Sequence, residues 1–313
     1  MLVVMVLGVI AGTALPLQTN VNTRLRQTVG SPFLATFLSF SIGTLSLLVA
    51  TLVMDGRLPG PSAAAGTPAW LWIGGVFGII VLTANLFMFP RLGAVQTAVL
   101  PVTGQVLMGL LIDHFGWFRT EQVDLGLTRG LGGLLVLVGV FGAIGAADRV
   151  FGRAGGAPTG SSHGASAWLW RLVGIGCGAL MASQTAINGR LGVALGSAIA
   201  ATLISFAVGV VALLIILLVT RTPWRWLRVD ERPNPWWMWT GGVLGAAFVF
   251  ANALLQPILG TGLTVMLILL GMMLGSLAID ALGLLGARRK RVTLFQAIGL
   301  VLMIAGVGLI RLV

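Results

Sequence analysis

The chain has 313 residues and a formal net charge of +11, yet only 9% of its residues are charged and 57% are hydrophobic. Soluble domains carry about 25% charged residues, so this composition excludes a soluble enzyme and a disordered protein. One cysteine and two histidines exclude a disulfide framework and give no basis for a metal site, and no cofactor is expected. In a membrane protein the positive charge is attributed to arginine-rich cytoplasmic loops, so no nucleic-acid partner is expected. The sequence predicts an all-α membrane protein.

Ten stretches have the roughly 20 apolar residues that a helix needs to cross a bilayer. They run over residues 2–19, 33–54, 69–89, 94–112, 127–147, 168–187, 198–219, 236–255, 262–284 and 293–312. The third and fourth are separated by Pro90-Arg91-Leu92-Gly93. The first is not expected to be a cleaved signal peptide, because it lacks a basic start.

Lysine and arginine are unevenly divided between the two predicted membrane sides. Ten spans place both termini on one side, whose loops carry 5 of the 19 basic residues, and the opposite side carries 14. Because basic loops remain in the cytoplasm, we expect both termini to lie outside.

The two halves of the sequence repeat. Residues 18–25, Gln-Thr-Asn-Val-Asn-Thr-Arg-Leu, align with residues 184–191, Gln-Thr-Ala-Ile-Asn-Gly-Arg-Leu. Further matches are Gly74-Gly75 with Gly241-Gly242, Asn85 with Asn252, Pro90 with Pro257, and Asp113 with Asp280. We expect repeats at 1–147 and 168–313, joined by a cytoplasmic linker at 148–167. Each repeat has an odd number of spans, so the second should be inverted, as in many secondary transporters. A duplicated scaffold without transport activity is the alternative.

Several motifs resemble the YdcZ-type family of the drug/metabolite transporter superfamily. They are Leu17-Gln18-Thr19 with Asn22, Gly30-Ser31-Pro32, Trp72-Ile73-Gly74-Gly75, Gly104-Gln105 and the stretch 111–116, Leu-Ile-Asp-His-Phe-Gly. The resemblance implies a ten-helix transporter-like bundle in a bacterial inner membrane, without fixing a substrate. The second half departs from the pattern, because Met272 replaces Gln105 and Ala281 replaces His114.

Amide side chains inside the spans are the candidate substrate-binding residues. An unpaired amide in hydrocarbon is costly, so each needs a partner or water. A cavity lined by amides is one interpretation, and hydrogen bonds that tie helices together are the other. The candidates are Gln18, Asn22, Asn85, Gln96, Gln105, Gln184, Asn188 and Asn252.

Asp113 and Asp280, near the ends of the fourth and ninth spans, are candidates for ion coupling. The alternative is an anchoring contact, for Asp113 with Arg119 or Arg129. A helix-dipole role is not expected for Asp113, because it lies near the C-terminal end of its own helix. The middle of the first span has no acid, which argues against a simple cation as substrate.

The function expected from these features is secondary transport of a small polar metabolite or drug-like solute, by alternating access at the repeat interface. A lipid-carrier flippase and a non-transporting membrane partner are the alternatives. No nucleophile–base pair, metal triad or Walker motif supports an enzyme or direct use of ATP. Membrane lipid is an expected partner, and a homodimer is left open.

Overall fold

The protein is described by a computed structural model over residues 1–60, 67–144, 165–222, 234–284 and 292–311. These residues are mainly helical, and no strand occurs among them. The helices are α1 (Leu2–Val29), α2 (Pro32–Asp55), α3 (Gly74–Phe115), α4 (Leu127–Ala143), α6 (Ala165–Leu195), α7 (Ala198–Val219), α8 (Gly241–Leu259), α9 (Thr261–Leu282) and α10 (Leu294–Arg311), with short 3-10 turns η2 (Ala69–Ile73), η3 (Trp117–Arg119) and η4 (Trp236–Trp239). The predicted all-α membrane fold is confirmed.

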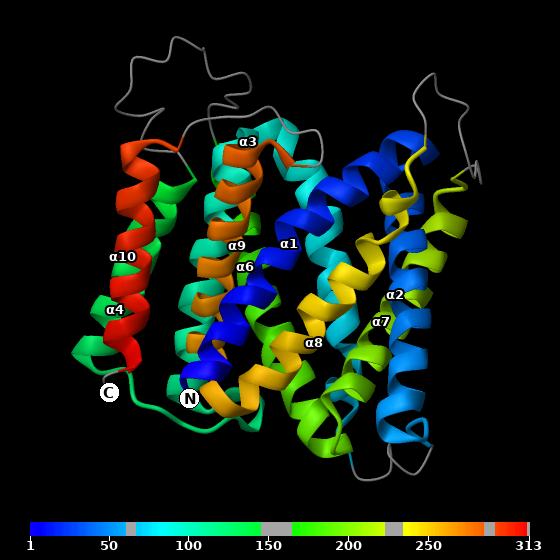
Figure 1. Ribbon diagram of the computed structural model, residues 1–313, viewed down its shortest axis with the longest axis horizontal. Helices are drawn as coiled ribbons and strands as arrows, with labels where there is room; N and C mark the ends of the chain where they lie inside the picture. Colours follow the sequence, from blue (N-terminus) through cyan, green and yellow to red (C-terminus); the bar gives the residue numbers. More distant parts are fainter. Residues whose placement is uncertain (61–66, 145–164, 223–233, 285–291, 312–313) are drawn as a thin grey trace.

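Long apolar helices form one bundle, and both chain ends lie at the same end of it (Figure 1). Within the described residues, six helices are long and apolar enough to cross a membrane: Leu2–Val29, Pro32–Asp55, Gln96–Phe115, Ala198–Val219, Gly241–Leu259 and Thr261–Leu282. Three shorter apolar helices cover Ala69–Asn85, Leu127–Ala143 and Leu294–Ile310. The shared end for the termini agrees with an even number of crossings.

The first and sixth helices extend well beyond the apolar spans that the sequence predicts. Instead of ending at residue 19, α1 continues to Val29 and stops at Gly30, whose φ of 75° is readily adopted by glycine. Gly196, with φ 67°, follows α6 at the matched place. Hydropathy identifies only the part of a helix that lies in the hydrocarbon layer, whereas the helix itself continues until a capping residue ends it. Both polar motifs therefore lie on helices.

The predicted break at Pro90-Arg91-Leu92-Gly93 is not a break in secondary structure. The backbone stays helical through this stretch, so the third and fourth predicted spans form the two arms of α3. Figure 1 shows these arms meeting at the top of the view, at the end of the bundle opposite the termini. Proline removes one backbone donor and bends a helix without necessarily ending it.

The halves meet antiparallel at two places. Phe40 of α2 stacks on Phe206 of α7, its matched residue, with ring centroids 4.7 Å apart. At one edge of the bundle α4 and α10 lie side by side (Figure 1). A Cβ on Gly132 would lie 2.7 Å from the carbonyl oxygen of Gly306, and one on Gly139 would lie 2.6 Å from that of Gly299. Because one number rises as the other falls, these helices are antiparallel, as inverted repeats require.

The predicted domain limits, 1–147 and 168–313, stay predictions. The linker expected at 148–167 falls mostly in residues 145–164, which lie outside the described residues.

Candidate functional site

The amides of the first motif pack against glycines of the opposite half. A Cβ on Gly245 of α8 would overlap the amide of Gln18, and one on Gly241 would overlap Oδ1 of Asn22. Asn22 Oδ1 also accepts a hydrogen bond from Ser39 Oγ at 3.1 Å. The glycines let α1 and α8 approach closely enough for both amides to lie between them.

The second half repeats this arrangement at the matched residues. A Cβ on Gly74 of α3 would overlap Oδ1 of Asn188, and one on Gly78 would lie 3.3 Å from the amide of Gln184. Asn188 is 1% exposed. Its Oδ1 has no hydrogen-bond partner within the described part of the chain. The paired motifs therefore position helices across the repeat interface, and one of them leaves a buried acceptor unused.

Asn85 and Asn252 occupy matched positions but have different surroundings. Asn252 is buried; its Oδ1 accepts from Thr185 Oγ1 at 3.3 Å and its Nδ2 donates to Phe248 O at 2.8 Å. The same Thr185 Oγ1 also lies 3.2 Å from Met181 O of its own helix. Thr185 belongs to α6, so this contact closes α6 against α8. In the first half, Oδ1 of Asn85 is buried without a partner among the described residues. Thr19, the counterpart of Thr185, is exposed and donates to Leu15 O of its own helix at 2.9 Å.

Gln256 was not among the candidates chosen from the sequence, although it lies on α8 one turn after Asn252, where α8 packs against α6. It is 4% exposed, and its Nε2 donates to Thr261 Oγ1 at 3.2 Å. A Cβ on Gly189 of α6 would overlap its Oε1. Its matched residue in the first half is Phe89, so the search for repeated amides passed over it.

The two remaining candidate amides lie along the contact between α3 and α6. Gln96 Oε1 accepts from Arg171 Nε at 3.1 Å. Gln105 is 6% exposed and lies where α3 crosses α6, since a Cβ on Gly178 would lie 2.6 Å from its backbone nitrogen. Neither residue lies in the contact that joins Asn252 to Thr185.

Asp113 is fully buried and joins three helices. Its Oδ1 accepts from the Thr261 N–H at 2.7 Å, and its Oδ2 accepts from the Gly262 N–H at 2.9 Å. Nη2 of Arg129 lies 3.2 Å from the same Oδ2, and Nη1 of Arg129 donates to Val123 O at 3.1 Å. The structure thus pairs Asp113 with Arg129, one of the two arginines expected as alternative partners from the sequence. The expectation of no helix-dipole role is wrong, because the carboxylate lies at the N-terminus of a different helix, α9.

Asp280 has no such arrangement. It is half-buried near the end of α9, and no hydrogen bond or ion pair joins its carboxylate to another described residue. The two matched acids therefore differ between the halves, as the two matched asparagines do.

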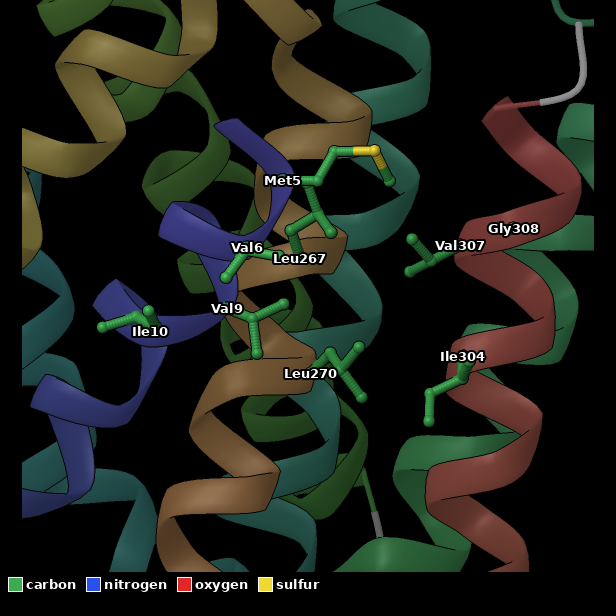
Figure 2. A pocket seen from close by; sticks show the side chains of 9 residues that line it. All are labelled: Met5, Val6, Val9, Ile10, Leu267, Leu270, Ile304, Val307 and Gly308. Atoms are coloured by element: carbon green, nitrogen blue, oxygen red, sulfur yellow. The ribbon is translucent and has the colours of Figure 1, made fainter. Parts of the chain in front are cut away.

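An apolar pocket of about 320 Å³ lies between α1, α9 and α10. Figure 2 shows side chains from these three helices around it. None of the candidate amides or acids lines it, and its lining is Met5, Val6, Val9, Ile10, Leu267, Leu270, Ile304, Val307 and Gly308. In a membrane such a pocket suits a hydrocarbon chain and not a polar solute.

Comparison with solved structures gives the fold. One structure, described as "Crystal structure of protein", is 18% identical, with a TM-score of 0.67 over 99% of this chain and 96% of that one. At this identity the likeness shows a shared fold alone. A search of curated proteins gives no match.

Comparison with protein families gives two matches in succession. The DMT_YdcZ family, with the description "Putative inner membrane exporter, YdcZ", matches residues 3–142 and again residues 169–309. This agrees with the repeat seen in the sequence and with its fused form. The chain is a multi-pass membrane protein of a transporter family, not an enzyme, and it belongs to the YdcZ family of the drug/metabolite transporter superfamily.

Proposed function

We propose that the chain is a secondary transporter that moves a small polar solute by alternating access between its inverted repeats. The proposal rests on one observation: two contacts at matched positions of the repeats differ between the halves. Thr19 and Thr185 both contact a carbonyl oxygen of their own helix, but Thr185 Oγ1 also reaches Asn252 Oδ1 at 3.3 Å. In the first half Asn85 Oδ1 has no partner among the described residues. In an inverted pair these contacts lie toward opposite membrane faces, and a transporter needs one closed while the other is open.

The uneven distribution of lysine and arginine assigns the open contact, between Thr19 and Asn85, to the cytoplasmic side. The side opposite the termini carries 14 of the 19 basic residues, and basic loops remain in the cytoplasm. The conformation is then open toward the cytoplasm and closed outward. Both termini lie outside in this assignment.

The proposed solute is neutral, zwitterionic or weakly anionic. Helix α1 contains no Asp or Glu, so it lacks the acid that would hold a cation there. Asn85 Oδ1 is an acceptor without a partner among the described residues, and Thr19 and Thr23 of α1 are exposed. We propose that the solute contacts Asn85 first. The full proposed set of binding residues is the one expected from the sequence: Gln18, Asn22, Asn85, Gln96, Gln105, Gln184, Asn188 and Asn252.

The test begins with a thermal-shift screen of purified protein against polyols, zwitterionic amino acids and nucleosides. A ligand that binds the native state raises its stability. The compound with the largest shift is then used, radiolabelled, for uptake into proteoliposomes. We expect a saturable uptake that empty vesicles lack.

Asn85→Ala should then weaken binding by up to roughly tenfold, as expected for one lost hydrogen bond to a neutral solute. Gln105→Ala should also weaken transport. Gln122→Ala, which removes an exposed loop amide, is the matched control and should bind normally. Normal binding and uptake by both Asn85→Ala and Gln105→Ala would leave the amides as contacts between helices only.

A second candidate function, movement of a lipid-linked solute, is favoured by the apolar pocket. Exposed Val6, Ile10 and Ile304 line it and lie where a lipid chain can reach them. A water-soluble compound that is transported in the absence of any lipid-linked form would exclude this function. Stabilisation by polyprenyl phosphate, with no response to the soluble compounds, would favour it.

A further inference from the structure

Two matched tetrapeptides of the chain adopt different backbone conformations. Pro90-Arg91-Leu92-Gly93 and Pro257-Ile258-Leu259-Gly260 share the pattern Pro-x-Leu-Gly at corresponding places in the two halves. In the second half the helix ends there, and Gly260 has φ 78° and ψ 168°, a region that essentially only glycine enters. In the first half α3 passes through Gly93 without a break.

The break at Gly260 creates the helix end that Asp113 binds. The first N–H groups of a helix have no acceptor within it, so those of Thr261 and Gly262 point outward. Asp113 takes both of them, at 2.7 and 2.9 Å. This contact ties the end of α3 to the start of α9 on the side of the membrane where the chain termini lie.

The matched elements on the other side are present but not joined. Asp280 corresponds to Asp113, and Ala94 and Val95 correspond to Thr261 and Gly262. The backbone of residues 94 and 95 lies inside continuous α3, so its N–H groups belong to the helix. Figure 1 shows the bend of α3 at one end of the bundle and the α8–α9 junction at the other.

We infer that Asp113 and Asp280 are alternating latches, each closing one side of the protein by binding the helix end that a break at Gly260 or Gly93 exposes. This inference rests on the proposed alternating access. In the present state the Asp113 latch is closed and α3 is unbroken. In the other state α3 breaks at Gly93, Asp280 binds the N–H groups of residues 94 and 95, and Asp113 releases α9.

The latches are unequal in strength. Arg129 adds an ion pair to the Asp113 latch, at 3.2 Å. The matched residue is Gln296, which is neutral and whose Oε1 accepts from the Thr293 N–H at 3.0 Å. The side of the termini should therefore be closed for most of the time in the absence of solute.

The test measures maleimide labelling of two single-cysteine reporters in a Cys177→Ser background. Thr19→Cys reports on the side that is open here, and Thr185→Cys reports on the closed side. Rates are compared only within one reporter. Asp280→Asn should slow labelling of the Thr185→Cys reporter by about tenfold, because a lost latch removes at least one charged hydrogen bond from the rarer state. It should leave the Thr19→Cys reporter as reactive as before.

Asp113→Asn should act in the opposite direction, with faster labelling of the Thr185→Cys reporter and slower labelling of the Thr19→Cys reporter. A glycine pair gives a second, independent reading that keeps both carboxylates. Gly93→Ala should behave like Asp280→Asn, because alanine fits the unbroken helix and not the broken one. Gly260→Ala should behave like Asp113→Asn, because its Cβ would also lie 3.0 Å from Asp113 Oδ2.

Two failures are distinguishable. If the Thr185→Cys reporter labels at the same rate in every variant, including Asp113→Asn, the protein does not alternate and the proposed function falls with the latches. If Asp113→Asn speeds labelling of that reporter but Asp280→Asn and Gly93→Ala leave it unchanged, alternation stands and the Asp280 latch is refuted. Opposite shifts in the two aspartate variants would support it.

Discussion

The Asp113 carboxylate and the Arg129 guanidinium form a buried ion pair, with Oδ2 and Nη2 3.2 Å apart and side-chain exposures of 0% and 6%. Asp113 lies in the last turn of α3 and Arg129 lies in the first turn of α4. The pair therefore holds these two helix ends together on the side of the chain termini. Removing one member of such a pair leaves the other buried without its counter-charge, which is more costly than the pair itself is stabilising.

Arg129→Ala should therefore lower the free energy of unfolding by roughly 3 kcal/mol. Arg129→Lys should lose less, because the positive charge remains but the planar fork is lost. Thermal denaturation of detergent-purified protein, followed by the fraction that stays monodisperse, measures both. Arg119→Ala, which removes an exposed arginine close in sequence, is the control and should change little. Equal loss in the Arg119 and Arg129 variants would contradict the ion-pair argument.

The helices, the duplication and the inverted arrangement were predictable from the sequence. Long apolar runs need only hydropathy to be identified, and the repeated motif at Gln18 and Gln184 gives the register. What the sequence could not provide was the partner of each polar group. The contact between Asp113 and the backbone of Thr261 depends on how two helix ends that are distant in sequence meet. Every residue except proline has a backbone N–H group, so the sequence does not indicate which of them binds a carboxylate.

Glycines on α4 give a second prediction, with a matched pair in one helix. Gly132 lies against α10, where an added Cβ would be 2.7 Å from the carbonyl oxygen of Gly306, whereas nothing lies within 4 Å of a Cβ on Gly130. Gly132→Ala should separate α4 from α10 and lower thermal stability, by about 1–3 kcal/mol for an overpacked contact. Gly130→Ala should be neutral or raise stability by up to about 1 kcal/mol. A similar response in both variants would mean that close packing at Gly132 does not matter.

Membrane orientation gives a third prediction, which follows from the uneven distribution of arginine and lysine. Cysteines placed at exposed Glu121 and exposed Arg91 lie in the structure toward opposite ends of the bundle. In intact cells, with Cys177 replaced by Ser, an impermeant maleimide should label Glu121→Cys and should label Arg91→Cys only after the membrane is opened. Cysteine at residue 1 should behave like Glu121→Cys. Labelling in the reverse order would invert the orientation, and with it the assignment of the cytoplasmic side.

The candidate site was predictable only as a set of residue types. Repetition singled out Asn85 and Asn252 as equivalents, yet Asn252 Oδ1 has Thr185 as a partner and Asn85 Oδ1 has none among the described residues. Equivalent sequence predicts equivalent chemistry, whereas a transporter with inverted repeats must hold its halves in unequal states. The proposed alternation would likewise account for a continuous α3 where α8 and α9 are separate, although both places read Pro-x-Leu-Gly.

The central claim, that the two sides close in turn, is tested most directly by distances between spin labels at matched positions. Gln27 and Arg91 lie at exposed places on one side, and Val193 and Ile258, their counterparts, lie at exposed places on the other. Pulsed electron resonance on the Cys177→Ser protein should give two populations for each pair. Asp113→Asn should enlarge the rarer population, which has a shorter Gln27–Arg91 distance and a longer Val193–Ile258 distance. Asp280→Asn should reduce that rarer population and leave the main distances unchanged. A single, unchanged population for both pairs, or two distances that rise and fall together, would contradict alternating access.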